Sequence, residues 1–304
     1  MENNTSMIHS NQAKFQYLIE QISSVLGFDK FLIEKDYFLT LLLSHISGLS
    51  PNLIFKGGTC LNKIYFDYHR LSEDLDFLIQ LPKDKMTRRE RSQLMKPIKD
   101  KIGSFAGQFG LSIEDAAKSA HNESTMYNFK LFYNSVISKR DGVIQLDISL
   151  KESHISPAEQ KDIRHKFYSP AGEPLIESGT IKALSLQEVL AEKLRAGITR
   201  KEIAARDFYD LDYAIRNNFN FKDNAFINML KKKLIFDNAD PNLNQYCLNL
   251  GRSAAEIKAM REMLSKELYP TLNVKEKTKY NLDIALKRIN DLMKSLSDIE
   301  KTEF

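Results

Sequence analysis

The chain has 304 residues, of which 42% are hydrophobic, which is enough for a packed core in one large domain or two smaller ones. Its formal net charge of +4 is mildly basic and is compatible with a nucleic-acid partner without requiring one. The two cysteines, Cys60 and Cys247, lie far apart and form no Cys-x-x-Cys pattern, which argues against a disulfide framework and a cysteine-based zinc site. We therefore expect a cytoplasmic protein.

No membrane or secretory segment is expected. The first twelve residues are polar and lack the apolar core of a signal peptide. The most apolar run, residues 37–46, is shorter than the roughly 20 residues that a membrane-spanning helix needs. The six histidines form no His-x-His or His-x-x-x-His pair, so a histidine-based metal site is not expected either.

The first half of the chain mixes helix and strand patterns. Apolar residues recur at helical spacing over residues 12–26, and Gly27 is a plausible stop. The next expected elements are a buried helix at 30–47, a strand at 53–56, a short helix at 59–66, a strand at 75–79 and a long basic helix at 86–109. Strand patterns follow over 111–152, most clearly at 142–150, and lead into a proline-containing loop.

The second half of the chain has an almost continuous helical pattern. Five helices are expected, at 186–200, 205–217, 223–235, 252–268 and 277–299. We therefore predict an α+β domain at residues 1–185 and a helical bundle at 186–304.

Three aspartates are the strongest chemical signal. Asp74 and Asp76 are two residues apart in an expected strand, so both face one side while the apolar residues between and after them face the core. Asp147 lies on the polar face of a second expected strand. If the two strands are neighbours, three carboxylates converge, and such oxygen ligands suit Mg²⁺. Glu73 precedes the strand and receives no catalytic role.

Gly57, Gly58 and Thr59 lie just upstream of the aspartates. Glycines let the backbone approach a ligand closely, amides at a helix start bind phosphate, and a threonine adds a hydroxyl donor. Taken alone, this turn could simply link two elements, and an Asp-x-Asp pair could be a solvated loop. Together they are typical of a nucleoside-triphosphate site.

The ordered set of motifs resembles a known family. The Gly-Gly-Thr turn followed by Arg-Leu-Ser-Glu-Asp-Leu-Asp-Phe at 70–77 resembles the polymerase-β-type nucleotidyltransferases, and within them the AbiEii/AbiGii toxin family. The sequences EKDY at 34–37, LQEVLAEKLRA at 186–196 and RDFYDL at 206–211 also fit that family. The resemblance covers about residues 30–215. The departures are Gly-Thr in place of the usual Gly-Ser and a longer spacer before Asp74.

The resemblance implies a polymerase-β-type domain with a mixed sheet, and a helical bundle that contributes to the active-site cleft. It implies that Asp74, Asp76 and Asp147 are catalytic and bind Mg²⁺, with Mn²⁺ as an alternative. Lys193 joins them as a catalytic residue that meets the triphosphate. The nucleotide-binding residues that it implies are Gly57, Gly58, Thr59, Lys63, Arg70, Ser72, Lys193 and Asp207.

Two basic features have competing interpretations. Lys193 lies beside the buried stripe of its helix, where it could contact the triphosphate with Asp207 holding it, or form an ordinary surface ion pair. The basic segment 83–101 could attract an RNA backbone, or be a solvated helix face.

The function implied is that of a Mg²⁺-dependent nucleotidyltransferase, the toxin of a toxin–antitoxin or abortive-infection system. It would transfer NMP from an NTP to an RNA hydroxyl, with the tRNA 3′ end as leading acceptor, and would have a cognate antitoxin. Two alternatives remain open: a protein or small-molecule acceptor, and a catalytically silent nucleotide-binding module.

Overall fold

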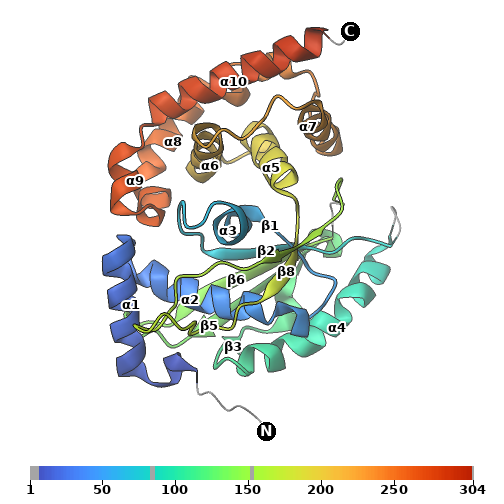
Figure 1. Cartoon of the computed structure of the whole chain (residues 1–304). Coiled ribbons are helices and arrows are strands. Elements are labelled where there is room, and N and C mark those ends of the chain that lie inside the picture. Colours follow the sequence, from blue (N-terminus) through green and yellow to red (C-terminus); the bar gives the residue numbers. More distant parts are fainter. Residues whose placement is uncertain (1–6, 83–85, 151–153, 303–304) are drawn as a thin grey trace. The chain divides into compact units, whose positions relative to one another are not determined.

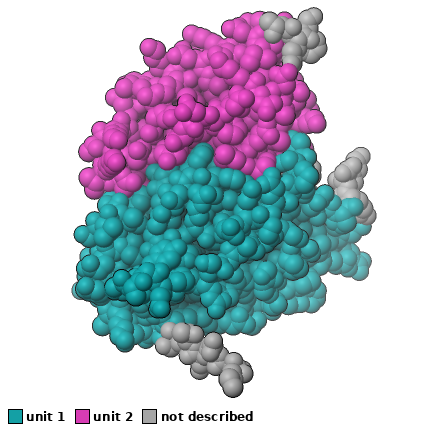
Figure 2. Space-filling model, viewed as in Figure 1, with its two compact units in different colours: residues 1–184 teal, residues 185–304 magenta. Residues whose placement is uncertain are grey.

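The computed structural model describes residues 7–82, 86–150 and 154–302. The chain divides into two compact units, residues 1–184 and 185–304, which are coloured separately in Figure 2. Within the described residues, no helix combines the length and the apolar character needed to cross a membrane. The start of the predicted basic segment, residues 83–85, and the end of the predicted strand region, residues 151–152, lie outside the described residues.

The first unit is built on one mixed sheet, as predicted, with strand order β3-β5-β6-β2-β1-β8-β7 and β4 paired to β5 (Figure 1). The strands are β1 Ile54–Lys56, β2 Asp74–Leu78, β3 Ser112–Ile113, β4 Ala120–His121, β5 Met126–Tyr133, β6 Gly142–Ser149, β7 Glu159–Asp162 and β8 Thr180–Ala183. Strand β2 runs parallel to β6, and β1 runs parallel to β8, whereas the other paired strands are antiparallel.

The helices of the first unit are α1 Gln12–Leu26, α2 Lys30–Ser44, α3 Gly57–Cys60 with the π-helical turn Leu61–Tyr65, and α4 Arg88–Gly107. Side-chain caps start three of them, α1, α2 and α4. The side chain of Asn11 caps α1, which ends at Gly27 with a φ of 72°. A capping box of Thr87 and Glu90 starts α4.

The core of the first unit follows from strand alternation. Leu75 and Phe77 of β2 and Leu146 and Ile148 of β6 are fully buried, while the alternate positions of both strands carry the aspartates. Helix α2 packs against β6 and β8, and α1 packs against α2.

The second unit is helical throughout. Its helices are α5 Leu186–Thr199, α6 Ala205–Arg216, α7 Asn224–Phe236, α8 Ala254–Glu267, α9 Val274–Lys279 and α10 Leu282–Thr302, with short 3-10 turns between α7 and α8 and between α8 and α9. The last helix buries an apolar stripe. Its members Leu282, Ala285, Leu286, Ile289, Met293 and Leu296 are buried, and Leu292 is half-buried.

The structure differs from the predicted elements in three places. The helix predicted at 30–47 ends at Ser44, and a 3-10 turn follows. Two short strands, β7 and β8, lie where a loop was expected, since four residues each are too few for a clear alternation. The helix predicted at 277–299 is broken at Tyr280 and Asn281, where the Asn281 side chain caps α10 by accepting from the Ile284 amide.

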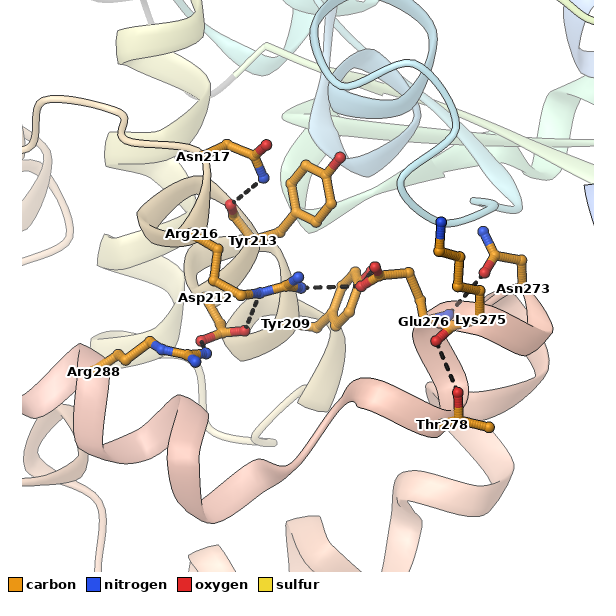
Figure 3. A network of polar contacts seen from close by, with 10 residues as sticks. All are labelled: Tyr209, Asp212, Tyr213, Arg216, Asn217, Asn273, Lys275, Glu276, Thr278 and Arg288. Atoms are coloured by element: carbon orange, nitrogen blue, oxygen red, sulfur yellow. Dashed lines mark hydrogen bonds and ion pairs between the residues drawn. The ribbon is translucent and has the colours of Figure 1, made fainter.

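A network of charged side chains connects three helices of the second unit (Figure 3). Asp212 of α6 accepts from Arg216 at 2.9 Å and from Arg288 of α10 at 2.8 Å. Glu276 of α9 accepts from Arg216 and from the Tyr209 hydroxyl, each at 3.1 Å. Because the Asp212 side chain is only 2% exposed, its two partners compensate for the cost of burying a carboxylate.

The Asp212→Ala variant should therefore lower the free energy of unfolding by about 1.5–3 kcal/mol, since the hydrogen bonds that Arg216 and Arg288 donate to this carboxylate are lost. Chemical denaturation measures this change. The control is Asp283→Ala, which removes the Arg261–Asp283 pair of the same unit, with both side chains about half exposed or more. Equal effects of the two variants would contradict a stabilising role for the network.

Candidate functional site

Strands β2 and β6 bring the predicted aspartates together. The two strands are parallel neighbours, and their register pairs Asp76 with Asp147 and Asp74 with Gln145. Since residues two apart share a face, all three carboxylates leave the same side of the sheet. The condition for the three carboxylates to converge, that the two aspartate strands are neighbours, is met.

Asp147 is held by an amide that the sequence analysis did not single out. The Asn128 side chain of β5 donates to Asp147 at 2.5 Å, and the two residues are directly paired in the antiparallel β5–β6 register. Burial raises the pKa of Asp147, the nearby Asp74 carboxylate adds to that shift, and the Asn128 hydrogen bond opposes it. The sequence did contain a signal that could have identified Asn128. Residues 126–133, MYNFKLFY, alternate between apolar and other side chains, which puts Asn128 on the face opposite the apolar one.

The donor set has the chemistry that Mg²⁺ prefers, namely hard carboxylate oxygens on one surface. Among residues 7–82, 86–150 and 154–302, however, no three His, Cys, Asp or Glu side chains are arranged as a group that could hold a metal ion. The metal-binding role of Asp74, Asp76 and Asp147 therefore stays a prediction.

The glycine turn packs directly onto the aspartate strand. Gly57 has a φ of 77°, and a Cβ at this position would overlap the Asp76 carboxylate. A Cβ on Gly58 would lie 2.6 Å from a guanidinium nitrogen of Arg70 and 3.0 Å from the Ser72 hydroxyl. The structure thus brings five predicted site residues, Gly57, Gly58, Arg70, Ser72 and Asp76, into one cluster.

Thr59, a predicted nucleotide-binding residue, makes a hydrogen bond inside the protein. Its side chain is buried, and its hydroxyl donates to the Asp74 backbone carbonyl at 2.5 Å. The hydroxyl therefore fixes the start of β2 against α3, and contributes to the site by positioning Asp74.

Lys63 lies below the surface. Its ammonium is fully buried, lies 2.6 Å from Asp36 in an ion pair, and donates to Thr40 at 2.8 Å and to Tyr68 at 2.7 Å. Burial lowers the pKa of Lys63, and the charge of Asp36 opposes that shift. Because its donors are already used inside the core, we do not retain Lys63 among the proposed nucleotide contacts.

The motif EKDY at residues 34–37 connects four separate segments to α2. Glu34 accepts from the Ser135 hydroxyl and the Val136 amide, both at 2.6 Å. The Lys35 ammonium lies 3.3 Å from the Glu73 carboxylate. Glu73 immediately precedes β2, as predicted.

Asp36 and Tyr37, the second half of that motif, also contact segments distant in the sequence. Asp36 holds Lys63, and Tyr37 bonds the His9 ring at 3.0 Å. Through these contacts the motif holds segments that neighbour the candidate site in place against α2.

In the second unit, Lys193 of α5 is bound by two acids of α6. Its ammonium lies 2.7 Å from Asp207 and 3.2 Å from Asp210, and Arg200 reaches Asp207 at 3.0 Å. The Lys193 side chain is 13% exposed and that of Asp207 3%, so this is not an ordinary surface pair. The predicted Lys193–Asp207 contact is present.

Comparison with known proteins identifies the family. The family profile described as "Nucleotidyl transferase AbiEii toxin, Type IV TA system" matches residues 41–286. The chain belongs to the AbiEii family. It is therefore a nucleotidyltransferase toxin of a type IV toxin–antitoxin system, which implies an NTP substrate and a cognate antitoxin. A search of curated proteins finds no match.

Solved structures share the fold at low sequence identity. MenT4, a nucleotidyltransferase toxin from Mycobacterium tuberculosis, is 15% identical with a TM-score of 0.58, and the match covers 94% of this chain and 92% of that one. A putative nucleotidyltransferase from H. pylori is 14% identical with a TM-score of 0.51, over 91% and 100% of the two chains. JHP933 from Helicobacter pylori is 14% identical with a TM-score of 0.50, over 91% and 96%.

The Gly57→Ala variant should lose transferase activity and unfold at lower denaturant than wild type, because the new methyl group displaces the Asp76 carboxylate. Gly172→Ala is the matched control, since Gly172 also has a positive φ, 83°, but its Cβ would meet nothing within 4 Å. Both variants carry the left-handed backbone cost of about 1–2 kcal/mol. Activity and denaturation curves that are the same for both variants would contradict the proposed contact.

Glu34 should make stability depend on pH. Burial raises its pKa above the ordinary 4.5, so the folded chain binds this proton more tightly than the unfolded chain. Its stabilising contribution is full below pH 4.5 and is lost as the pH rises through the folded-state pKa.

Glu34→Gln removes this titration, so its stability relative to wild type should improve as the pH rises from about 4 to 7. Denaturation curves across that range, with the exposed Glu177→Gln as control, measure the effect. A constant difference between Glu34→Gln and wild type would refute it.

Proposed function

We propose that this AbiEii-family chain is a Mg²⁺-dependent enzyme that transfers NMP from an NTP to an RNA hydroxyl, with the tRNA 3′ end as leading acceptor. The observation that carries the proposal is the packing of Gly57 against Asp76, whose strand partner is Asp147. A close-approach turn and an acidic strand face are the two parts that phosphate and metal recognition require.

In this mechanism Asp74, Asp76 and Asp147 would hold Mg²⁺, or Mn²⁺. The metal would neutralise charge on the phosphates and polarise the phosphorus–oxygen bond. Gly57 and Gly58 let a phosphate approach the backbone, and Arg70 and Ser72 beside Gly58 are the proposed polar contacts to it.

The reaction forms one bond and breaks another. The acceptor hydroxyl attacks the α-phosphorus, and the bond to pyrophosphate breaks. Asp147 is the proposed acceptor of the hydroxyl proton, and burial together with the Asp74 charge raises its pKa, which favours proton uptake. Asn128 orients the Asp147 carboxylate and limits that rise.

In the second unit, Lys193 is the proposed contact to the triphosphate, and Asp207 and Asp210 hold its ammonium. An ammonium suits phosphate as a compact point charge. Since the acids already fix its position, the lysine loses little side-chain entropy when a phosphate is present.

The positive charge of helix α4 favours a nucleic acid as the acceptor. It carries six basic and two acidic side chains, and Arg88, Arg89 and Lys101 are exposed. A run of cations attracts a phosphate backbone and is not needed for a small neutral acceptor. We place the reaction in the cytoplasm, the compartment expected from the two distant cysteines and the one that supplies NTPs and tRNA.

Incubation with total tRNA, Mg²⁺ and each labelled NTP should give labelled RNA with at least one nucleotide, and chelation should abolish it. Asp74→Asn and Asp76→Asn should lower the rate at least about 100-fold, because transition-state charge is no longer stabilised. Asp147→Asn should lower it about 10²–10⁴-fold. The exposed Asp283→Asn is the control.

Three outcomes oppose the proposal. Label on protein or a small molecule, and none on RNA, identifies the alternative acceptor. NTP binding by calorimetry without transfer to any acceptor identifies a silent nucleotide-binding module. Transfer by Asp74→Asn at the wild-type rate removes the aspartates from the mechanism.

A further inference from the structure

The first unit has an open groove of about 720 Å³ along α1 that the proposed transfer does not use. One wall is α1, and the other is formed by Lys166, Tyr168, Ser169, Pro170 and Leu175. A volume between about 300 and 1,000 Å³ with mostly apolar walls and a few polar groups is typical of small-molecule sites.

Helix α1 has two apolar stripes, of which the fold uses only one. Phe15, Ile19 and Ile22 are buried against the unit. A second stripe, which includes Tyr17 and Val25, lines the groove, with exposed fractions of 64% and 81%. An apolar stripe at helical spacing that remains exposed is a marker of a binding surface.

The opposite wall is a tight hairpin whose shape is fixed. Tyr168 and Pro174 form a bridge, and Leu175 donates its amide to the Phe167 carbonyl at 2.9 Å. The Tyr168 ring stacks on His165 at a centroid distance of 4.8 Å. These contacts hold the wall in place, so a ligand entering the groove has little ordering cost.

The charge of the groove has one sign. Lys14 and Lys166 line it, and no aspartate or glutamate does so among the described residues. Lys166 already pairs with Asp67 at 2.8 Å. Lys14 is exposed, and its ammonium makes no ion pair or hydrogen bond to any other described residue. Lys14 is therefore the cation most available to a ligand.

We propose that this groove binds an anionic amphiphile, a molecule with one apolar chain or ring system and one carboxylate-like head. The apolar body lies between Tyr17 and Val25 on one side and Tyr168 and Pro170 on the other. The head pairs with Lys14, assisted by Lys166. A second copy of the chain fits less well, because it would bring an equally cationic groove to the same surface.

The probes are three ten-carbon amphiphiles that differ only in the head: decanoate, decanol and decyltrimethylammonium. Calorimetric titration should show saturable binding of one decanoate per chain, at least tenfold weaker binding of decanol and no binding of the cation. Lys14→Glu should weaken decanoate binding at least tenfold and leave decanol binding unchanged.

Val25→Asp should abolish binding of decanoate and decanol, because it puts a carboxylate on the apolar wall. Val274→Asp, at a site that is 66% exposed in the other unit, is the matched control and should bind like wild type. Circular dichroism and denaturation curves show that each variant is folded. Transfer activity should be unchanged in Val25→Asp, so this test is independent of the proposed reaction.

Equal binding of all three amphiphiles, or decanoate binding unchanged by Val25→Asp, overturns the proposal. A wild-type dimer in sedimentation that becomes monomeric in Val25→Asp overturns it as well, because it identifies a second copy as the occupant.

Discussion

The site depends on the contact between a backbone turn and a carboxylate. Gly57 adopts a left-handed φ, and its missing side chain leaves the space that the Asp76 carboxylate occupies. Thr59 then ties the start of the same strand to the turn through the Asp74 carbonyl. Neither part can shift without the other, so the proposed phosphate contacts and the proposed metal ligands keep a fixed relation.

A buried ion pair between Lys63 and Asp36 stabilises the segment that follows the Gly57 turn. Lys63 lies in the π-helical turn after α3 and is held by Asp36 and Tyr68 in the core. Burying both charges is costly. Part of that cost is offset because Lys63 also donates to the Thr40 hydroxyl and the Tyr68 hydroxyl donates to Asp36. The pair fixes the π-helical turn to α2, so the motif at residues 34–37 stabilises the segment that follows the glycine turn.

Local patterns in the sequence predicted much of the fold and part of the site. Strand alternation placed Asp74, Asp76 and Asp147 on polar faces, and helical spacing identified α1 and α10. Strands β7 and β8 were not predicted, because four residues are too few to show a clear alternation of apolar and polar side chains. Lys63 was predicted as a nucleotide contact because a lysine suits phosphate as well as a buried carboxylate, and its pairing with Asp36 inside the core became visible only in the structure.

The sequence by itself determined which residues could do chemistry, because glycine flexibility, carboxylate charge and alternation are local properties. It also determined the family, through an ordered set of motifs. Only the tertiary structure decided which of these residues meet. Contacts between segments far apart in the chain pair Asp76 with Asp147, bring the Asn128 amide to Asp147 and bury Lys63. Such contacts are selected by packing and register, which no short stretch of sequence contains.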